Sequence, residues 1–178
     1  ALQVQNGVDG EVSNTAVGWQ AGANVTTGIH NTFIGKRAGG RQDANGVTTG
    51  NYNTVVGHQA ATALPAGANT NTAIGYQSLT AGNNSSTSHN TCLGYSSGSS
   101  ITTGHTNTIL GSGAQASGAA AENQTVIGYD AAGVGNNSVT LGDANVTDVY
   151  MAEDSGARVH AGDYKTASGA STLGTGST

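Results

Sequence analysis

Residues that build ordinary cores and active sites are scarce in this 178-residue chain. It has one cysteine, one proline, one tryptophan and one phenylalanine, and aromatic residues make up 4% of it. A single cysteine, Cys92, excludes an intrachain disulfide, so we expect it to serve in packing. A chain with 29 glycines and so few large side chains has little material for a conventional globular core.

Charge is also scarce. No Asp, Glu, Lys or Arg occurs from Ala44 to Ala121, and the net charge is −5. Phosphate backbones are bound by many Lys and Arg side chains, so we expect no nucleic-acid partner. The local basic cluster Lys36, Arg37 and Arg41 is interpreted as a solvated rim. Acidic residues gather near the end of the sequence, at Asp143, Asp148, Glu153, Asp154 and Asp163.

The sequence offers no catalytic or cofactor motif. Its acids are isolated, and no Ser/His/Asp set or phosphate-binding glycine loop stands in a supporting context. We therefore expect no enzyme activity, no cofactor and no metal, although one histidine per chain on a threefold axis could supply three ligands. No apolar run approaches a membrane span, and the amino end lacks a secretion signal pattern. The five histidines are His30, His58, His89, His105 and His160.

What the chain does have is a repeat, an aliphatic residue followed by glycine and usually preceded by Asn-Thr-x. The glycine-to-glycine spacings are 17, 22, 18, 19, 17, 17 and 14 residues, the length of one coil of a solenoid. We predict an all-β, parallel β-solenoid (a β-roll or β-helix) of about eight coils of 14–22 residues. The predicted turn glycines are Gly18, Gly35, Gly57, Gly75, Gly94, Gly111, Gly128 and Gly142.

Each repeat predicts a short strand with apolar residues on both faces. The residue before each glycine is always aliphatic, and we assign it to the core together with the Thr two positions earlier. The residue between them is also mostly apolar, and a small residue three positions after the glycine suits a tight corner. The predicted core residues are Val17, Ile34, Val56, Ile74, Leu93, Leu110, Ile127 and Leu141.

Two apolar faces in so short a strand favour an oligomer. One aliphatic side chain contributes roughly 1.5–3 kcal/mol when buried, whereas each ordered residue costs about 1.5 kcal/mol. A coil of this length therefore needs a second apolar face from neighbouring chains, and we expect a homotrimeric fibre. A self-sufficient monomeric solenoid is the alternative.

The residue after each glycine forms a second series, part of which is aromatic. Aromatic faces beside amides and hydroxyls can hold uncharged sugars, so we predict glycan contacts at Trp19, His58, Tyr76, Tyr95 and Tyr129. Packing between subunits or over the turn is the alternative role for these rings. The remaining members of the series are Lys36, Ser112 and Asp143.

The organisation along the chain has three parts. Residues 1–13 lack the repeat and are interpreted as an incoming segment or cap, and 14–142 form the solenoid. Residues 143–178 form a terminal module, with short alternating strands predicted at Asn145–Met151 and Ala157–Gly162. Two insertions, Arg41–Gly46 and Asn83–Ser88, are expected to emerge as loops. A shared formula, as in Val25-Thr26-Thr27-Gly28 and Ile101-Thr102-Thr103-Gly104, is interpreted as a strand and turn of the same coil.

The repeats resemble those of two families. NSVTLG at Asn137–Gly142 is similar to the repeat of the YadA-like head of trimeric autotransporter adhesins, and copies such as NTAIGYQS at Asn71–Ser78 resemble bacteriophage tail fibre repeats. The stretch Asn145–Gly162 resembles the one that in such fibres precedes a self-cleaving chaperone, which this chain does not contain. The resemblance implies trimerisation and attachment to a cell surface, while most spacings exceed the 14 residues of the adhesin roll.

These observations lead to three hypotheses. The first is a structural and adhesive fibre protein, a phage tail fibre segment in the virion that attaches to a bacterial surface glycan through many weak sites. The second is a self-assembling extracellular bacterial filament or trimeric surface adhesin. The third is an ice-binding solenoid, which the inward assignment of Thr disfavours.

Overall fold

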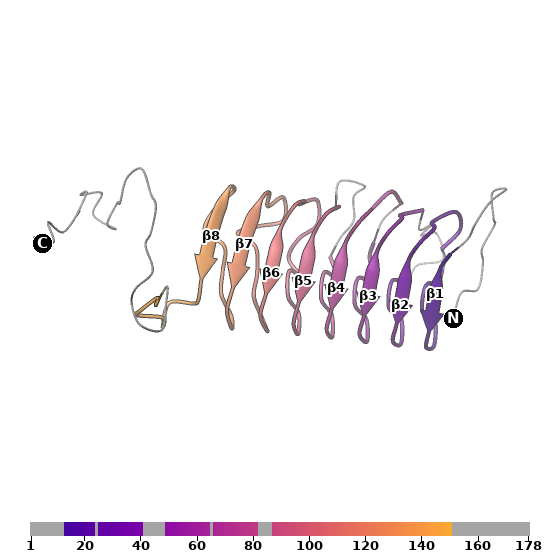
Figure 1. Cartoon of the computed structure of the whole chain (residues 1–178), viewed down its shortest axis with the longest axis horizontal. Coiled ribbons are helices and arrows are strands. Elements are labelled where there is room, and N and C mark those ends of the chain that lie inside the picture. Colours follow the sequence, from indigo (N-terminus) through magenta and orange to yellow (C-terminus); the bar gives the residue numbers. More distant parts are fainter. Residues whose placement is uncertain (1–12, 24, 41–48, 65, 82–86, 151–178) are drawn as a thin grey trace, which may run out of the picture. The chain divides into compact units, whose positions relative to one another are not determined.

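The structure is a computed structural model that describes residues 13–23, 25–40, 49–64, 66–81 and 87–150. Over these residues the chain is all-β, with eight parallel strands in one sheet and about seven turns of a solenoid (Figure 1). The predicted β-solenoid is therefore confirmed. The strands are β1 (Thr15–Val17), β2 (Thr32–Ile34), β3 (Thr54–Val56), β4 (Thr72–Ile74), β5 (Thr91–Leu93), β6 (Thr108–Leu110), β7 (Gln124–Ile127) and β8 (Ser138–Leu141).

The strands stack in sequence order and in strict register. Thr pairs with Thr from β1 to β7, and the residue before each glycine pairs with its equivalent in the next coil, as in Leu93↔Leu110. Each coil adds one strand, so coils of different length all return to the same position. The length differences are absorbed outside the sheet, which is why a spacing of 22 residues does not disturb the register of β2 and β3.

The core differs from the prediction. The inward residue is the middle one of the strand, and Phe33, Val55 and Ile109 are completely buried. The predicted core residues point outward instead, and their exposed fractions reach 58% at Val17. Successive strand residues face opposite sides of a sheet, so one side only can look into the coil. The outward assignment covers Val17, Ile34, Val56, Ile74, Leu93, Leu110, Ile127 and Leu141, of which Val56 and Ile74 are partly buried.

Side-chain volume is balanced inside each coil. The small residues three positions after the turn glycine, such as Ala38 and Ser78, are buried. The largest inward side chain, Phe33, lies against Gly39, where an added Cβ would be 2.1 Å from the ring. The coil with the small Ala73 instead carries buried Leu79 at the equivalent position. Close packing of this kind leaves no room to enlarge one position alone.

A ladder of buried amides runs beside the strands. The residue before each strand's Thr is Asn in six coils. Its Oδ1 accepts a hydrogen bond from a backbone N–H of the next coil, as when Asn53 N–H donates to Asn31 Oδ1 at 2.9 Å. Its Nδ2 donates to a carbonyl of the following coil, as from Asn53 to Ala68 at 2.8 Å. These bonds satisfy polar groups that would otherwise be costly to bury. The ladder comprises Asn14, Asn31, Asn53, Asn71, Asn90, Asn107 and Gln124.

The predicted turn glycines are confirmed. All eight have positive φ, from 83° at Gly142 to 144° at Gly111. They also lie directly above one another: a Cβ on Gly75 would be 2.3 Å from the carbonyl oxygen of Gly94. Both the backbone conformation and the contact between coils therefore require glycine here.

The second side of the coil is less regular than predicted. Val25 and Ile101 are buried, but the Thr-Thr-Gly residues that follow them form bends and no strand. The strand predicted at Asn145–Met151 is also absent over residues 145–150. The chain divides into two compact units, Ala1–Val146 and Thr147–Thr178. The second predicted terminal strand and most of both insertions lie outside the described residues.

Candidate functional site

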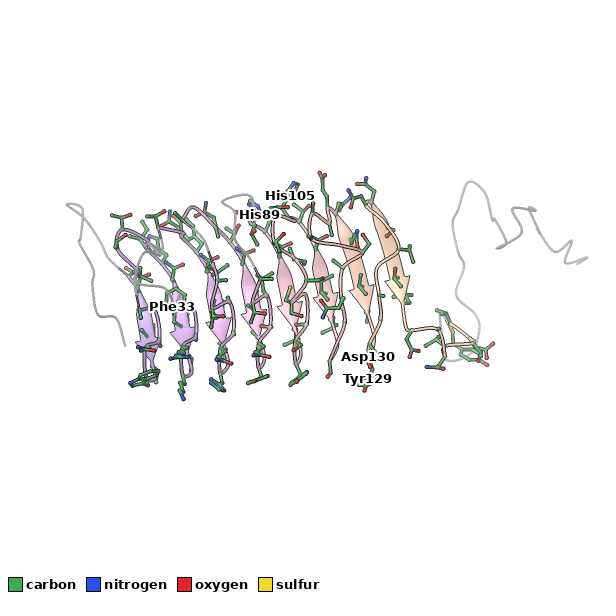
Figure 2. All side chains as sticks on the ribbon, turned by 180° about the vertical axis from the view of Figure 1, so that it is seen from behind. Phe33, His89, His105, Tyr129 and Asp130 are labelled. Carbon is green, nitrogen blue, oxygen red and sulfur yellow. The ribbon has the colours of Figure 1, made fainter. Side chains whose placement is uncertain are left out.

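The residues after the turn glycines form one row, which we call the corner row. Its members are Trp19, Lys36, His58, Tyr76, Tyr95, Ser112, Tyr129 and Asp143. Backbone hydrogen bonds hold successive members together: the carbonyl of Tyr76 accepts from Ser96 N–H, and that of Tyr95 accepts from Gly113 N–H, both at 2.8 Å. The row follows the carboxyl ends of the strands, where Figure 2 labels Tyr129. Backbone hydrogen bonds therefore place equivalent members of the row above one another in successive coils, as predicted.

Three of the predicted glycan residues form a continuous series of ring contacts, in which Tyr76 and Tyr95 are stacked and His58 is tilted by 59° against Tyr76. The ring centroids of His58 and Tyr76 are 5.3 Å apart, and those of Tyr76 and Tyr95 are 5.4 Å apart with an interplanar angle of 17°. The Tyr76 and Tyr95 rings therefore face each other along the solenoid and direct their edges outward. A sugar that stacks on an aromatic face can reach these rings only where a neighbouring ring is missing.

Trp19 is separated from this stack by a cationic pair. Lys36 Nζ lies 5.5 Å and Arg37 Cζ lies 5.1 Å from the centre of the Trp19 ring, within cation–π range. Arg37 Nε also donates to Gln20 Oε1 at 3.0 Å. The basic cluster is therefore more than the solvated rim predicted from the sequence, at least for Lys36 and Arg37, while Arg41 lies outside the described residues. The adjacency of Trp19 and Lys36 in the repeat register could have revealed this contact.

The other end of the corner row is acidic. A hydrogen bond to the Asp130 carboxylate, followed by the charges of Asp130 and Asp143, raises the pKa of Tyr129 above its usual value. Hydrogen bonds from Asn145, side chain first and backbone second, lower the pKa of Asp143. Figure 2 shows Tyr129 and Asp130 together at the same edge of the solenoid. In the sequence Asp130 stands as an isolated acid, and nothing in the repeat indicates this proximity to Tyr129.

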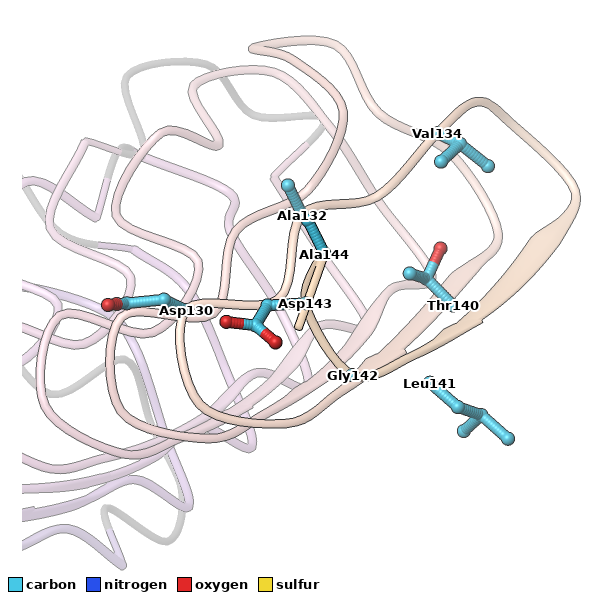
Figure 3. A pocket seen from close by; sticks show the side chains of 8 residues that line it. All are labelled: Asp130, Ala132, Val134, Thr140, Leu141, Gly142, Asp143 and Ala144. Carbon is cyan, nitrogen blue, oxygen red and sulfur yellow. The ribbon is translucent and has the colours of Figure 1, made fainter. Parts of the chain in front are cut away.

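The last coil bounds a pocket of about 570 Å³ (Figure 3). Its lining residues are Asp130, Ala132, Val134, Thr140, Leu141, Gly142, Asp143 and Ala144. Thr140 occupies the inward strand position, and its Oγ1 is buried without a hydrogen-bond partner. The pocket lies where one more coil would stack on β8, and its mixed lining presents no convergent set of polar groups.

The outer face of the sheet is a second candidate surface. It consists of one row of Thr and one row of aliphatic residues, and no strand residue is charged. Leu93, Leu110 and Ile127 each expose about two fifths of their surface, at 41%, 39% and 37%. An apolar ladder running the length of the sheet is typical of an interaction surface.

The described histidines do not form a metal site. In the described part of the chain no group of three His, Cys, Asp or Glu residues is placed to hold a metal ion. His30 stacks on Tyr52 with ring centroids 5.1 Å apart, and His105 Nε2 lies 4.0 Å from Glu122 Oε1. His89 and His105 lie at the edge opposite Tyr129 (Figure 2). Coordination across a threefold axis stays a prediction, and His160 lies outside the described residues.

The described residues contain no helix that is long and apolar enough to cross a membrane. Comparison of the chain with protein-family models, with curated proteins and with solved structures gave no match.

Proposed function

We propose that this chain is a segment of a homotrimeric adhesive fibre, such as a phage tail fibre in the virion, that attaches to a bacterial surface glycan. The observation that carries this proposal is the apolar ladder on the outer face of the sheet, next to an exposed aromatic corner row. The ladder supports self-association and the corner row supports sugar binding. The repeat resemblance to tail fibres and trimeric adhesins adds the cell-surface context.

The trimer follows from the chemistry of the outer face. Each coil contributes one aliphatic side chain that remains partly exposed in the single chain. Complete burial of such a side chain is worth roughly 1.5–3 kcal/mol, and the trimer would gain the share that belongs to the area still exposed. Eight such residues in register would together stabilise an assembly by several kcal/mol. Cyclic symmetry of three chains turns all three ladders inward and leaves none exposed. The absence of charge on the strands removes the desolvation cost that buried ions would impose.

The glycan follows from the chemistry around the corner row. The uncharged stretch offers amides and hydroxyls beside the rings, and Gln77 Nε2 donates to Gln59 Oε1 at 3.2 Å on the row next to His58 and Tyr76. Such groups orient sugar hydroxyls, while rings contact the apolar face of the sugar. Weak sites repeated on three chains gain strength through multivalency.

The test combines mass and attachment. Light scattering of the isolated chain should give three times 17.4 kDa, and the purified protein should compete with virions for adsorption to host cells. A folded monomer would contradict the trimer. Labelled antibody that marks cell-surface filaments and leaves virions unmarked would favour the bacterial filament or adhesin instead.

Ice binding becomes a second candidate because the sequence-based argument against it is wrong. The Thr residues of β1 to β7 face outward, in one straight row with one Thr per coil at about 4.8 Å. A flat Thr array of this kind can order water. The same face cannot both lie inside a trimer and contact ice, so a monomer that shows thermal hysteresis would select this function over the fibre.

A further inference from the structure

The stack of rings in the corner row ends at Tyr95. Between Tyr95 and Tyr129 stands Ser112, whose small side chain is exposed. The register is fixed by the backbone: Gly113 N–H donates to the Tyr95 carbonyl at 2.8 Å, and Asp130 N–H donates to the Ser112 carbonyl at 2.9 Å. Tyr95, Ser112 and Tyr129 therefore occupy the same corner in three successive coils, and the aromatic stack ends at Tyr95.

The exposed fractions of the rings reflect this interruption. Tyr76, with a ring on each side, is 38% exposed, whereas Tyr95 is 57% exposed with a ring on one side only. Tyr129 is 69% exposed and stacks on no other ring in the described residues. Ser112 thus leaves the face of Tyr95 that looks along the solenoid uncovered, and it separates Tyr95 from Tyr129 by one coil.

The spacing suits one additional ring. Coils follow each other at about 4.8 Å, so Tyr95 and Tyr129 are roughly 10 Å apart along the solenoid. A six-membered ring at the level of Ser112 would lie about 4.8 Å from each, within the 4.5–7 Å range of stacked ring pairs. A tyrosine at this position would simply continue the stack.

Polar groups lie beside this gap. Gly113 has a φ of 72°, and an added Cβ there would collide with Oδ1 of Asp130, so the carboxylate lies over the Gly113 backbone. The same carboxylate raises the pKa of the neighbouring Tyr129 phenol. Asp130 is free of any ion pair among the described residues, and its carboxylate has lone pairs left to accept from two neighbouring hydroxyls. Asp130 and Asp143 together repel acidic ligands.

We propose that Tyr95, Ser112, Tyr129 and Asp130 form a subsite for one uncharged hexopyranose ring in each chain. This inference rests on the proposed glycan-binding function and assigns it to one gap in the corner row. The sugar ring lies over Ser112 between the two tyrosines, and its hydroxyls donate to the Asp130 carboxylate. The cationic end at Trp19 differs from this gap, because Lys36 and Arg37 lie over the Trp19 ring.

The experiment uses the full chain in its assembled form. Saturation-transfer NMR with the methyl glycosides of glucose, galactose, mannose and N-acetylneuraminic acid should show binding of at least one neutral sugar and none of the acidic one. Ser112→Tyr fills the gap without disturbing the backbone, since Ser112 is outside the left-handed region, and should weaken binding about tenfold or more. Asp130→Asn, which keeps the shape of the side chain, should also weaken it.

Matched controls separate the subsite from the general function. Ser112→Ala keeps the gap open, and Tyr52→Ala removes an equally exposed ring outside the corner row, 57% exposed; both should bind as the parent does. If Ser112→Tyr and Asp130→Asn bind sugar and host cells as strongly as the parent, the subsite is wrong while the adhesive function stands. If the parent binds neither sugars nor cells, both proposals fail.

Discussion

The side-chain oxygen of Asn71 accepts hydrogen bonds from both nitrogen atoms of Asn90 in the next coil, the backbone N–H at 3.0 Å and Nδ2 at 3.2 Å. Asn71 Nδ2 in turn donates to Asn53 Oδ1 and to the Thr87 carbonyl. One buried amide thus connects three successive coils. The register of the sheet depends on this ladder, because each coil's backbone donor is satisfied by the side chain of the coil before it.

Replacing Asn71 by Ala should destabilise the solenoid locally. The change leaves the Asn90 N–H and the Thr87 carbonyl buried without their partners, and each orphaned group costs roughly 1–3 kcal/mol. We expect a loss of about 2–5 kcal/mol in the free energy of unfolding, together with faster amide exchange at Asn90. Thr72→Ala on the outer face is the matched control and should cost much less. Equal stability of the two variants would mean that the amide ladder contributes little.

The two faces of one strand should respond oppositely to charge. Ile109 is completely buried, whereas its neighbour Leu110 is 39% exposed. Ile109→Asp puts an unpaired carboxylate into the coil, which costs several kcal/mol, and should abolish the β-sheet signal in circular dichroism. Leu110→Asp leaves the coil intact but places a charge on the proposed trimer interface, so it should give a folded monomer by light scattering.

Either of two results would contradict that pair of expectations. A folded Ile109→Asp chain would overturn the inward assignment of the middle strand residue. A Leu110→Asp chain that still forms the parent assembly would show that the outer face of β6 lies outside the interface.

Cys92 should be unreactive in the folded chain. Burial raises the pKa of its thiol to about 12, and the thiolate is the reactive species. At pH 8 we expect no labelling by iodoacetamide until the chain is denatured, after which one thiol per chain should react. Rapid labelling under native conditions would indicate that the coil around β5 opens readily.

The sequence was sufficient to predict the coils but not the side of the strand that faces inward. Repeat length, parallel pairing and turn glycines follow from spacing alone, and all three are present. The inward side was misassigned because Ile109 and Leu110 are equally apolar, so alternation carries no information. Side-chain volume is a better signal. The inward residues vary in size, and the residue six positions later compensates: the small Ala73 is followed by Leu79, and the large Phe33 by Gly39. The outward residues before the glycine are all aliphatic and similar in size.

For the candidate site, the sequence predicts which corner residues lie above one another, but not how their side chains are oriented. Spacing places Tyr76 and Tyr95 one above the other, but the direction of a ring face depends on side-chain rotation, which the repeat does not encode. The contact of Lys36 and Arg37 with Trp19 and the position of Asp130 over Gly113 likewise depend on the local backbone. The sequence therefore predicts a discontinuous aromatic row but not which ring faces are covered, and the structure shows a stack that ends at Tyr95.

The titration of Tyr129 offers a direct test of its contact with Asp130. The hydrogen bond to Asp130 is the largest cause of the raised pKa, ahead of the charges of Asp130 and Asp143. Asp130→Asn removes the charge next to the phenol, so the pKa of Tyr129 should return toward 10, measured from the ¹³Cζ chemical shift as a function of pH. Asp143→Asn should lower it less. Because the folded-state pKa lies above the unfolded one, the contact stabilises the fold below pH 10 and this contribution is lost as the pH rises through the folded-state pKa. A Tyr129 pKa that is the same in the parent and in Asp130→Asn would show that the phenol and the carboxylate do not touch, and it would remove the polar anchor from the proposed sugar subsite.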